Sequence, residues 1–409
     1  QDLSLFPHMS IAENIAFDGM VGTVPHLVNR KSYRQRAADV LARLGVTLDL
    51  DAPLHDLAIA ERQIVAIARA LMGDARLVFM DEPTASLTQS ETDALLEIVR
   101  TLSKQGVTVV FVSHRLAEVL EISERVTVLR DGRLVGVYPT EGMTQTRLGE
   151  LMTGQTLSAT LRARDLNDQP AVLETHGLTR DGEFQDVSLT VRRGEVVGIT
   201  GLIGAGRTEL AHALIGMTRP DAGEILIDGA SVSPRHMRDA IKSGIAYVSE
   251  DRLALGLIQR QAIADNIAIT VLDRLLETAN LLSIRRKTDL VADWIDRLAI
   301  KIGGPDDAVS TLSGGNQQRV VLAKWLATEP KVLILDSPTV GVDVGARAGI
   351  FEIVRDLANR GMAILMISDE VPETYYNADR ILHMRGGRIV GTYDPRTADI
   401  DEVEVAVNA

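Results

Sequence analysis

Residues 311–326 read TLSGGNQQRVVLAKWL, and residues 333–343 read LILDSPTVGVD. The first stretch is a polar, glycine-containing turn that leads into a helix with apolar residues at helical spacing. Unpaired backbone amides and the helix dipole favour a bound anion at such a helix N-terminus. The second stretch continues an apolar strand from Val332 and ends it in the carboxylate of Asp336. A buried parallel strand of this kind delivers an acid to the carboxyl edge of a sheet, where magnesium and phosphates bind.

Four motifs recur at one constant distance along the chain, which indicates an internal duplication and predicts two related domains. Two copies are too few for a solenoid. The paired positions, all separated by the same number of residues, are Leu57 with Leu312, Asp81 with Asp336, His114 with Asp369, and Arg130 with Arg385.

Length and composition fit an ordinary soluble protein of two or three domains. The chain has 409 residues, of which 45% are hydrophobic and 24% charged. A net charge of −13 and an aromatic content of 3% argue against nucleic-acid binding. The absence of cysteine excludes disulfides and thiolate metal sites. No apolar run predicts a membrane span or a signal peptide, so a cytoplasmic protein is the default expectation.

Alternating strand and helix patterns predict an α/β protein whose two domains each have a mostly parallel sheet core. The first domain is assigned to residues 1–152, a polar linker to 153–170 and the second domain to 171–409. The second domain is expected to open with an antiparallel β part, and the acidic stretch after residue 395 offers no structural signal. Residues 8–56 are expected to be mostly helical, and strands are expected at 77–81, 108–113, 126–130, 171–175, 187–191 and 194–200.

A glycine-rich loop follows the last of these strands and opens a helix. Residues 201–208 read GLIGAGRT and match the phosphate-binding pattern GxxxxGK[ST], with Arg207 in place of lysine. Glycines let such a loop curl so that backbone amides face the phosphates, and the planar guanidinium can still neutralise phosphate charge. A plain strand–turn–helix turn is the alternative interpretation. The residues expected to bind ATP here are Gly201, Gly204, Ala205, Gly206, Arg207, Thr208 and Glu209.

Together these motifs resemble the signature sequence, Walker B strand and P-loop of ABC-type ATPases, which bind ATP with Mg²⁺. In that family, nucleotide lies between the P-loop and Walker B strand of one domain and the signature of the other. The resemblance therefore implies two composite sites. It adds Ser313, Gly314, Gly315 and Gln317 as ATP-binding residues, and Asp81, Asp336 and Thr208 as magnesium ligands.

The resemblance also implies that the two sites are unequal. The first domain has the residues expected for catalysis, namely Glu82 to activate water, His114 to contact the γ-phosphate and Gln1 for sensing. Its signature is degenerate, since residues 58–61 read AIAE. The second domain has an intact signature, but a serine hydroxyl is too weak a base to activate water at neutral pH. Its altered catalytic positions are Glu250, Ser337 and Asp369.

Four stretches resemble more narrowly the ATP-binding subunit of bacterial carbohydrate importers of the ribose, galactose, xylose and arabinose type. They are LSGGNQQR from Leu312, GAGRTE from Gly204, SEDRLALGL from Ser249 and DEPTASLT from Asp81. The resemblance implies two membrane permease subunits as partners and, indirectly, a periplasmic sugar-binding protein. It implies a peripheral location on the cytoplasmic face of the bacterial inner membrane, and helical subdomains at 8–56 and 258–310 that meet the permease.

Two alternatives to an importer subunit stay open at this point. One is a soluble ABC protein acting on ribosomes or in DNA repair, which the short, mixed-charge stretch 153–170 disfavours. The other is a non-catalytic remnant, because no P-loop precedes residue 57. The chain as given is therefore expected to be an N-terminally truncated member that hydrolyses ATP poorly, with natural loss of the loop as the alternative.

Overall fold

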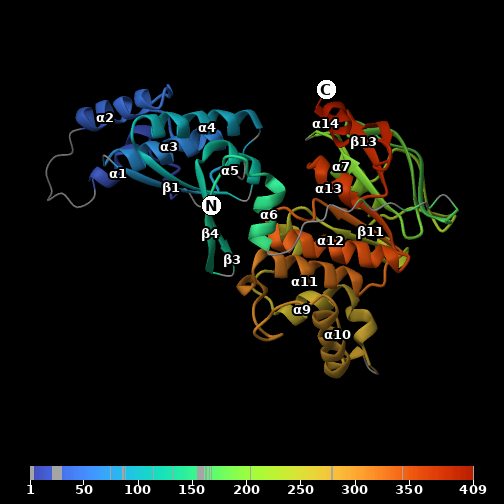
Figure 1. Cartoon of the computed structure of the whole chain (residues 1–409). Coiled ribbons are helices and arrows are strands. Elements are labelled where there is room, and N and C mark those ends of the chain that lie inside the picture. Colours follow the sequence, from blue (N-terminus) through green and yellow to red (C-terminus); the bar gives the residue numbers. More distant parts are fainter. Residues whose placement is uncertain are drawn as a thin grey trace. The chain divides into compact units, whose positions relative to one another are not determined.

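The computed structural model describes residues 4–20, 30–73, 75–84, 87, 89–113, 115–130, 132–153, 161, 164, 166, 168–202, 204–277, 280–342 and 344–408. The chain forms two compact units, Gln1–Leu157 (unit 1) and Ser158–Ala409 (unit 2). Figure 1 labels the helices and strands of both units. Among the helices of the described part, none has the length and apolar character needed to cross a membrane.

Unit 1 confirms the expected helices before residue 57 and the three expected strands. Its helical part packs around an apolar core that includes Ile11, Ile15, Leu41 and Val65. The elements are α1 (Ile11–Met20), α2 (Arg30–Arg43), η1 (Leu54–Asp56), α3 (Ile59–Leu71), β1 (Leu77–Asp81), α4 (Gln89–Lys104), β2 (Thr108–Val112), α5 (Leu116–Ile122), β3 (Arg125–Arg130), β4 (Arg133–Pro139) and α6 (Gln145–Thr153).

Within the described part of unit 1, the strands form two separate pairs. Strands β1 and β2 pair in parallel, and β3 and β4 pair antiparallel. Alternate side chains of β1 face solvent, and Phe79 is 71% exposed. This alternation is typical of a strand that is buried on one face only.

Unit 2 has the mixed α/β architecture expected of the second domain. Its elements are β5 (Ala171–Arg180), β6 (Phe184–Arg192), β7 (Val196–Thr200), α7 (Arg207–Leu214), β8 (Ala222–Ile227), β9 (Ala230–Val232), α8 (Met237–Lys242), β10 (Ile245–Val248), η2 (Arg252–Gly256), α9 (Ile263–Ala268), η3 (Ile269–Leu275), α10 (Ile284–Arg297), η5 (Val309–Thr311), α11 (Gly314–Leu326), β11 (Val332–Asp336), α12 (Val344–Asn359), β12 (Ala363–Ile367), α13 (Val371–Asn377), β13 (Arg380–Arg385), β14 (Arg388–Tyr393) and α14 (Ile400–Asn408).

The central sheet of unit 2 brings the predicted motifs to one edge. Its strand order is β10-β11-β12-β7-β13-β14, and all neighbours except β13 and β14 pair in parallel. Strands β7, β10, β11 and β12 are buried at every residue, as continuous apolar runs require. Because parallel strands end at the same edge, the loops after β7, β11 and β12 meet there.

Two further layers surround this sheet. Strands β6, β5, β8 and β9 form an antiparallel sheet, which confirms the antiparallel β part. Figure 1 shows α9 and α10 on the side of α11 that faces away from β11, forming the helical part of the unit. The structure corrects our assessment of the C-terminal stretch: α14 is a helix whose Val403 and Val407 are buried in the core. Its apolar residues four positions apart were the signal that the acidic composition obscured.

Most of the expected linker, 153–170, lies outside the described residues. The described part packs on unit 2, since Leu161 contacts its core and Arg164 donates to the carbonyl of Gly194 at 2.5 Å. The assignment of a linker over this range stays a prediction.

Candidate functional site

The glycine-rich loop of unit 2 connects β7 to α7. Gly206, with φ of 95°, is the N-cap residue of α7, and Gly204 has φ of 80°. A Cβ atom on Gly206 would lie 2.6 Å from the Glu183 carbonyl oxygen, and one on Gly201 would lie 2.1 Å from that of Met384. Glycine is therefore required at both positions by close backbone approach, and the loop leads directly into the N-terminus of α7.

Asp336 ends β11 beside this loop and is fully buried. Its Oδ2 atom accepts a hydrogen bond from the Tyr247 hydroxyl at 3.0 Å. Burial raises the pKa of Asp336, while the nearby Tyr247 and Thr208 hydroxyls oppose that rise. Burial also raises the pKa of Tyr247, so its hydroxyl stays protonated and can donate.

The surroundings of Asp336 fit a hard cation such as Mg²⁺. Its Oδ1 atom is buried and has no hydrogen-bond partner among the described residues. A carboxylate oxygen and the Thr208 hydroxyl are ligand types that Mg²⁺ accepts, with phosphates and water completing its shell. No cluster of three or more acidic, His or Cys side chains in the described part could hold a metal by itself. A cation here would therefore depend on bound phosphate.

Arg207 is held away from solvent by two partners at the end of β12. Its Nη1 atom donates to the Ser368 carbonyl at 2.9 Å, and its Nη2 atom forms a short ion pair with Asp369. The Arg207 side chain is only 7% exposed. In this structure, the P-loop arginine is thus paired with the residue at the switch position.

Three carboxylates interact with the charge of the Arg207 guanidinium. Asp369 forms an ion pair with it, and the charges of Asp336 and Glu250 also interact with it. The pKa of Glu250 is raised, first by partial burial and then by the negative charges of Asp336 and Asp369, while Arg207 lowers it. An additional anionic group near the loop would face like charges. The altered residues Glu250 and Asp369 therefore lie around one site. They add negative charge there, which a glutamine and a histidine at these positions would not do.

The signature turn of unit 2 lies before α11. Ser313 is its N-cap residue and is exposed, with its hydroxyl accepting from the Asn316 amide at 3.0 Å. Gly314 and Gly315 form the first turn of α11. The Gln317 side chain is buried and donates to the Val309 carbonyl at 3.3 Å. Ser313 is available to a ligand from outside, whereas the Gln317 amide already supports the turn.

In unit 1, Asp81 and Glu82 lie at the end of β1, as predicted. Glu82 has φ of 45°, and its amide donates to the Val112 carbonyl at 2.8 Å. Ser337 has the same φ of 45° after β11, and its amide donates to Ile367 at 2.9 Å. Positive φ in a non-glycine residue is strained and is found often at functional sites. The two copies therefore share one backbone geometry at the position assigned to the general base.

The degenerate signature of unit 1 keeps the backbone of the intact one. Ala58 is the N-cap residue of α3 with φ −62° and ψ 160°, and Ser313 has φ −62° and ψ 156°. The Glu61 carboxylate accepts from the Ala58 amide at 3.0 Å, and Ile59 is 51% exposed. The two signatures therefore differ in their side chains and not in the backbone conformation of their N-cap residues. Two residues assigned to catalysis, Gln1 and His114, lie outside the described residues.

Sequence reasoning missed three polar residues of these sites. Tyr247 contacts Asp336, and the buried glutamates Glu118 and Glu373 contact the loops that follow the strands. The glutamates could have been found, because they are separated by the same number of residues as the paired motifs.

Comparisons relate the chain to several known proteins. The family model described as ABC transporter matches residues 1–85 and 184–340. "Ribose import ATP-binding protein RbsA 2" of Streptomyces avermitilis is 45% identical over 406 residues, which are 99% of this chain and 80% of that protein. "Putative ribose/galactose/methyl galactoside import ATP-binding protein 3" of Agrobacterium fabrum is 40% identical over 391 residues, 95% of this chain and 77% of that protein. A solved structure of a nucleotide-free ATP-binding cassette from an ABC transporter is 21% identical, with a TM-score of 0.48, over 58% of this chain and 96% of that chain.

Proposed function

The chain belongs to the ABC transporter family, and from this premise we propose that it is the ATP-binding and hydrolysing subunit that powers carbohydrate uptake through a membrane importer. The observation that carries the proposal is the duplicated cassette, with a P-loop, a Walker B strand and an intact signature in unit 2. Relatives named as importers of ribose, galactose and methyl galactoside support a monosaccharide or a related carbohydrate as cargo.

The two nucleotide sites of this subunit are unequal in the proposed mechanism. The competent site combines Asp81, Glu82 and His114 of the first domain with the signature residues 313–315 of the second. Glu82 has the carboxylate that can take a proton from the attacking water, and it occupies a strained backbone position directly after β1. The signature supplies the Ser313 hydroxyl and helix N-terminal amides for phosphate oxygens.

The degenerate site combines Arg207, Asp336 and Ser337 of the second domain with residues 58–60 of the first. Ser337 lacks a basic group, and the Arg207–Asp369 ion pair occupies the guanidinium that would contact phosphate. Nucleotide that binds here has to break that pair, so we expect binding without turnover.

Mg²⁺ is the proposed metal at both sites. When bound with nucleotide, it would neutralise phosphate charge. Asp336 and Thr208 would hold it in unit 2, and their fit rests on the buried, unpartnered Oδ1 atom of Asp336. Asp81 would hold it in the first domain.

An importer subunit works with membrane permease partners, and we propose two permease chains and, indirectly, a periplasmic sugar-binding protein. The chain would then lie on the cytoplasmic face of the inner membrane as a peripheral subunit. The helical parts at 8–56 and 258–310 would meet the permease.

Reconstitution tests this function. The full-length protein is assembled in proteoliposomes with its permease and its sugar-binding protein, ATP is enclosed on the side of the ATPase subunit, and uptake of labelled monosaccharides is measured. We expect ATP-dependent uptake of one sugar and loss of uptake with Glu82→Gln. ATP turnover without accumulation of any carbohydrate would contradict the proposed cargo class.

A further inference from the structure

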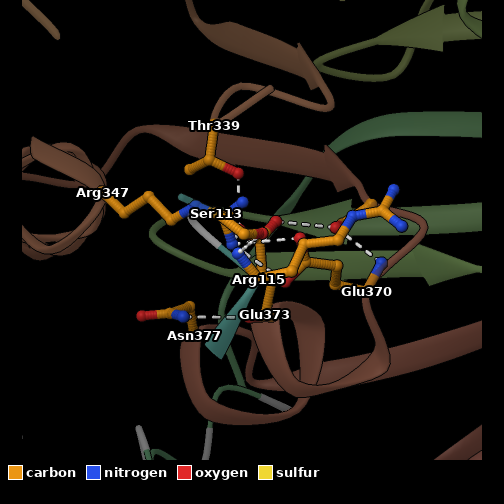
Figure 2. A network of polar contacts seen from close by, with 8 residues as sticks. Ser113, Arg115, Thr339, Arg347, Glu370, Glu373 and Asn377 are labelled. Carbon is orange, nitrogen blue, oxygen red and sulfur yellow. Dashed lines mark hydrogen bonds and ion pairs between the residues drawn. The ribbon is translucent and has the colours of Figure 1, made fainter. Parts of the chain in front are cut away.

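A buried carboxylate in unit 2 links the two loops that follow β11 and β12. Glu373 lies in α13 and is only 7% exposed. Its Oε1 atom accepts from the Thr339 hydroxyl at 2.5 Å, and its Oε2 atom accepts from the Ser368 hydroxyl at 2.7 Å. Thr339 follows the Walker B strand, and Ser368 directly precedes Asp369. Figure 2 shows Thr339 and Glu373 in this network.

Unit 1 brings the equivalent two hydroxyls to the equivalent glutamate, although there both donate to one carboxylate oxygen. The Oε2 atom of Glu118 accepts from the Thr84 hydroxyl at 2.6 Å and from the Ser113 hydroxyl at 3.3 Å. Ser113 precedes His114 as Ser368 precedes Asp369. In both copies, the serine hydroxyl also accepts a hydrogen bond from the backbone amide two residues later. The distance is 3.0 Å in unit 1 and 3.1 Å in unit 2.

Equivalent threonine and serine hydroxyls donate to the two carboxylates, but the cations that balance these carboxylates differ. In unit 1, Arg115 donates to Oε1 of Glu118 at 3.2 Å. In unit 2, the residue at that position is Glu370, and Arg347 of α12 pairs with both Glu370 and Glu373, at 2.9 Å and 3.4 Å. Both glutamates thus accept hydrogen bonds from a threonine and a serine, but a different arginine balances the negative charge in each unit.

In unit 2, this carboxylate is connected to the phosphate loop through one residue. The Ser368 side chain donates to Glu373, and the Ser368 carbonyl accepts from Nη1 of Arg207 at 2.9 Å. A displacement of Ser368 would therefore move the acceptor that holds the guanidinium. Ser368 lies between Glu373 and Arg207, so Glu373 would affect Arg207 by holding Ser368 in place and not by direct contact.

We propose that Glu373 is a positioning residue for the second nucleotide site, and that Glu118 has the same role in the first. Each carboxylate fixes the spacing between the Walker B loop and the residue before the switch position, and in unit 2 it thereby fixes Arg207. The inference rests on the proposed nucleotide binding at Arg207, and it assigns a role to residues outside the sequence motifs.

The test measures binding of mant-ADP with Mg²⁺ to the whole chain by fluorescence titration. Arg207→Ala defines the component that belongs to the second site. Glu373→Gln keeps the shape but leaves one acceptor oxygen for two hydroxyls, so we expect the Kd of that component to rise about tenfold. Ser368→Ala should raise the Kd similarly, whereas Ser368→Thr, which keeps the hydroxyl, should restore it.

A double variant separates positioning from general destabilisation. If Glu373 acts through Arg207, Glu373→Gln should not change mant-ADP binding further in the Arg207→Ala background. Asp379→Asn is the matched control, because Asp379 is a buried carboxylate that accepts from the Val196 amide at the opposite end of β7. It should shift the melting temperature and leave the Kd unchanged.

The outcomes distinguish the two proposals. Unchanged mant-ADP binding in Arg207→Ala would overturn the second nucleotide site, and the positioning role with it. Weaker binding in Arg207→Ala combined with an unchanged Kd in Glu373→Gln and Ser368→Ala would overturn the positioning role alone. An equal rise in Kd with Asp379→Asn would assign the effect to loss of stability, and would overturn it as well.

Discussion

At the scale of single residues, the two cassettes differ most at the position after the Walker B aspartate. Glu82 and Ser337 share a φ of 45°, so the backbone offers each side chain the same direction. Their chemistry separates them, because a carboxylate can accept a proton at neutral pH and a serine hydroxyl cannot. Both copies have the same φ at this position, but only the first copy has a side chain that could act as a general base.

We predict that Glu82→Gln lowers ATP turnover of the assembled importer by about 100-fold or more, the lower range of general-base effects, while ATP binding is retained. Ser337→Ala should change turnover less than about twofold, because Ser337 is not the base in the proposed mechanism. The measurement is phosphate release under saturating ATP, with nucleotide binding followed in parallel. Loss of turnover with Ser337→Ala would reverse the assignment of the competent and degenerate sites.

At the scale of elements, the phosphate loop depends on two glycines with different constraints. Gly204 has φ of 80° and open space where a Cβ atom would lie, whereas a Cβ atom on Gly206 would lie 2.6 Å from the Glu183 carbonyl oxygen. A left-handed conformation alone costs a non-glycine residue about 1–2 kcal/mol. A backbone clash adds to that cost, since the Glu183 carbonyl belongs to the turn directly before β6 and cannot move without moving that turn.

Gly206→Ala should therefore destabilise unit 2 more than Gly204→Ala. We expect about 1 kcal/mol for Gly204→Ala and roughly 3 kcal/mol or more for Gly206→Ala, measured as free energies of unfolding in urea. Mant-ADP binding at the Arg207 site should be weakened by Gly206→Ala. Equal effects of the two substitutions on unfolding would show that the contact with Glu183 does not constrain the loop.

Substitution of the two glycines in the signature turn is a poor test of nucleotide contact. A Cβ atom on Gly314 would lie 2.7 Å from the Gly341 carbonyl, and one on Gly315 would lie 2.4 Å from the Ala346 Cβ. Substitution of either glycine disturbs unit 2 itself, so its effect cannot be assigned to nucleotide contact. Ser313 is exposed and is the cleaner position.

Ser313→Ala should lower ATP turnover of the assembled importer about tenfold, the size of one lost hydrogen bond to a charged group. The melting temperature of the protein should stay the same, because the Ser313 side chain is exposed and caps no backbone amide of α11. Ala58→Ser is the matched control in the degenerate signature and should not change turnover. Normal turnover in Ser313→Ala would argue against phosphate contact by the signature serine.

At the scale of the whole molecule, a buried amine makes unfolding depend on pH. Lys324 of α11 donates to the Gly256 carbonyl at 2.5 Å and lies beside the Trp325 ring. Burial lowers its pKa to about 8 from an ordinary value of 10.5. Between these pH values, the unfolded chain binds more protons than the folded chain, so the free energy of unfolding rises with pH. Below about pH 8 the amine is charged in both states, and the cost of burying it is fully present.

Lys324→Met should remove this rise. We expect the free energy of unfolding of the wild type to gain up to about 3 kcal/mol relative to Lys324→Met between pH 8 and pH 10.5, measured by urea denaturation at several pH values. Lys301→Met, at an exposed position, is the control and should parallel the wild type. A constant difference between the wild type and Lys324→Met across this range would contradict the lowered pKa.

Sequence patterns alone predict the duplicated α/β architecture, the strands that carry the motifs and the glycine loop. These features depend on patterns of a few neighbouring residues, such as the apolar run before Asp336 and the glycines of 201–206. The helix α14 was not predicted, because its acidic residues dominated a stretch whose two buried valines pack on distant elements.

Which side chains meet at the strand ends depends on how the strands are arranged in the folded chain. Arg207 pairs with Asp369 across 162 positions of sequence, and Tyr247 reaches Asp336 across 89. These pairs follow from strand order, since β7 lies beside β12 and β10 beside β11. Local patterns carry no information about which strands become neighbours, so the ion pair on the P-loop arginine and the two hydroxyl partners of Glu373 could be found only in the folded chain.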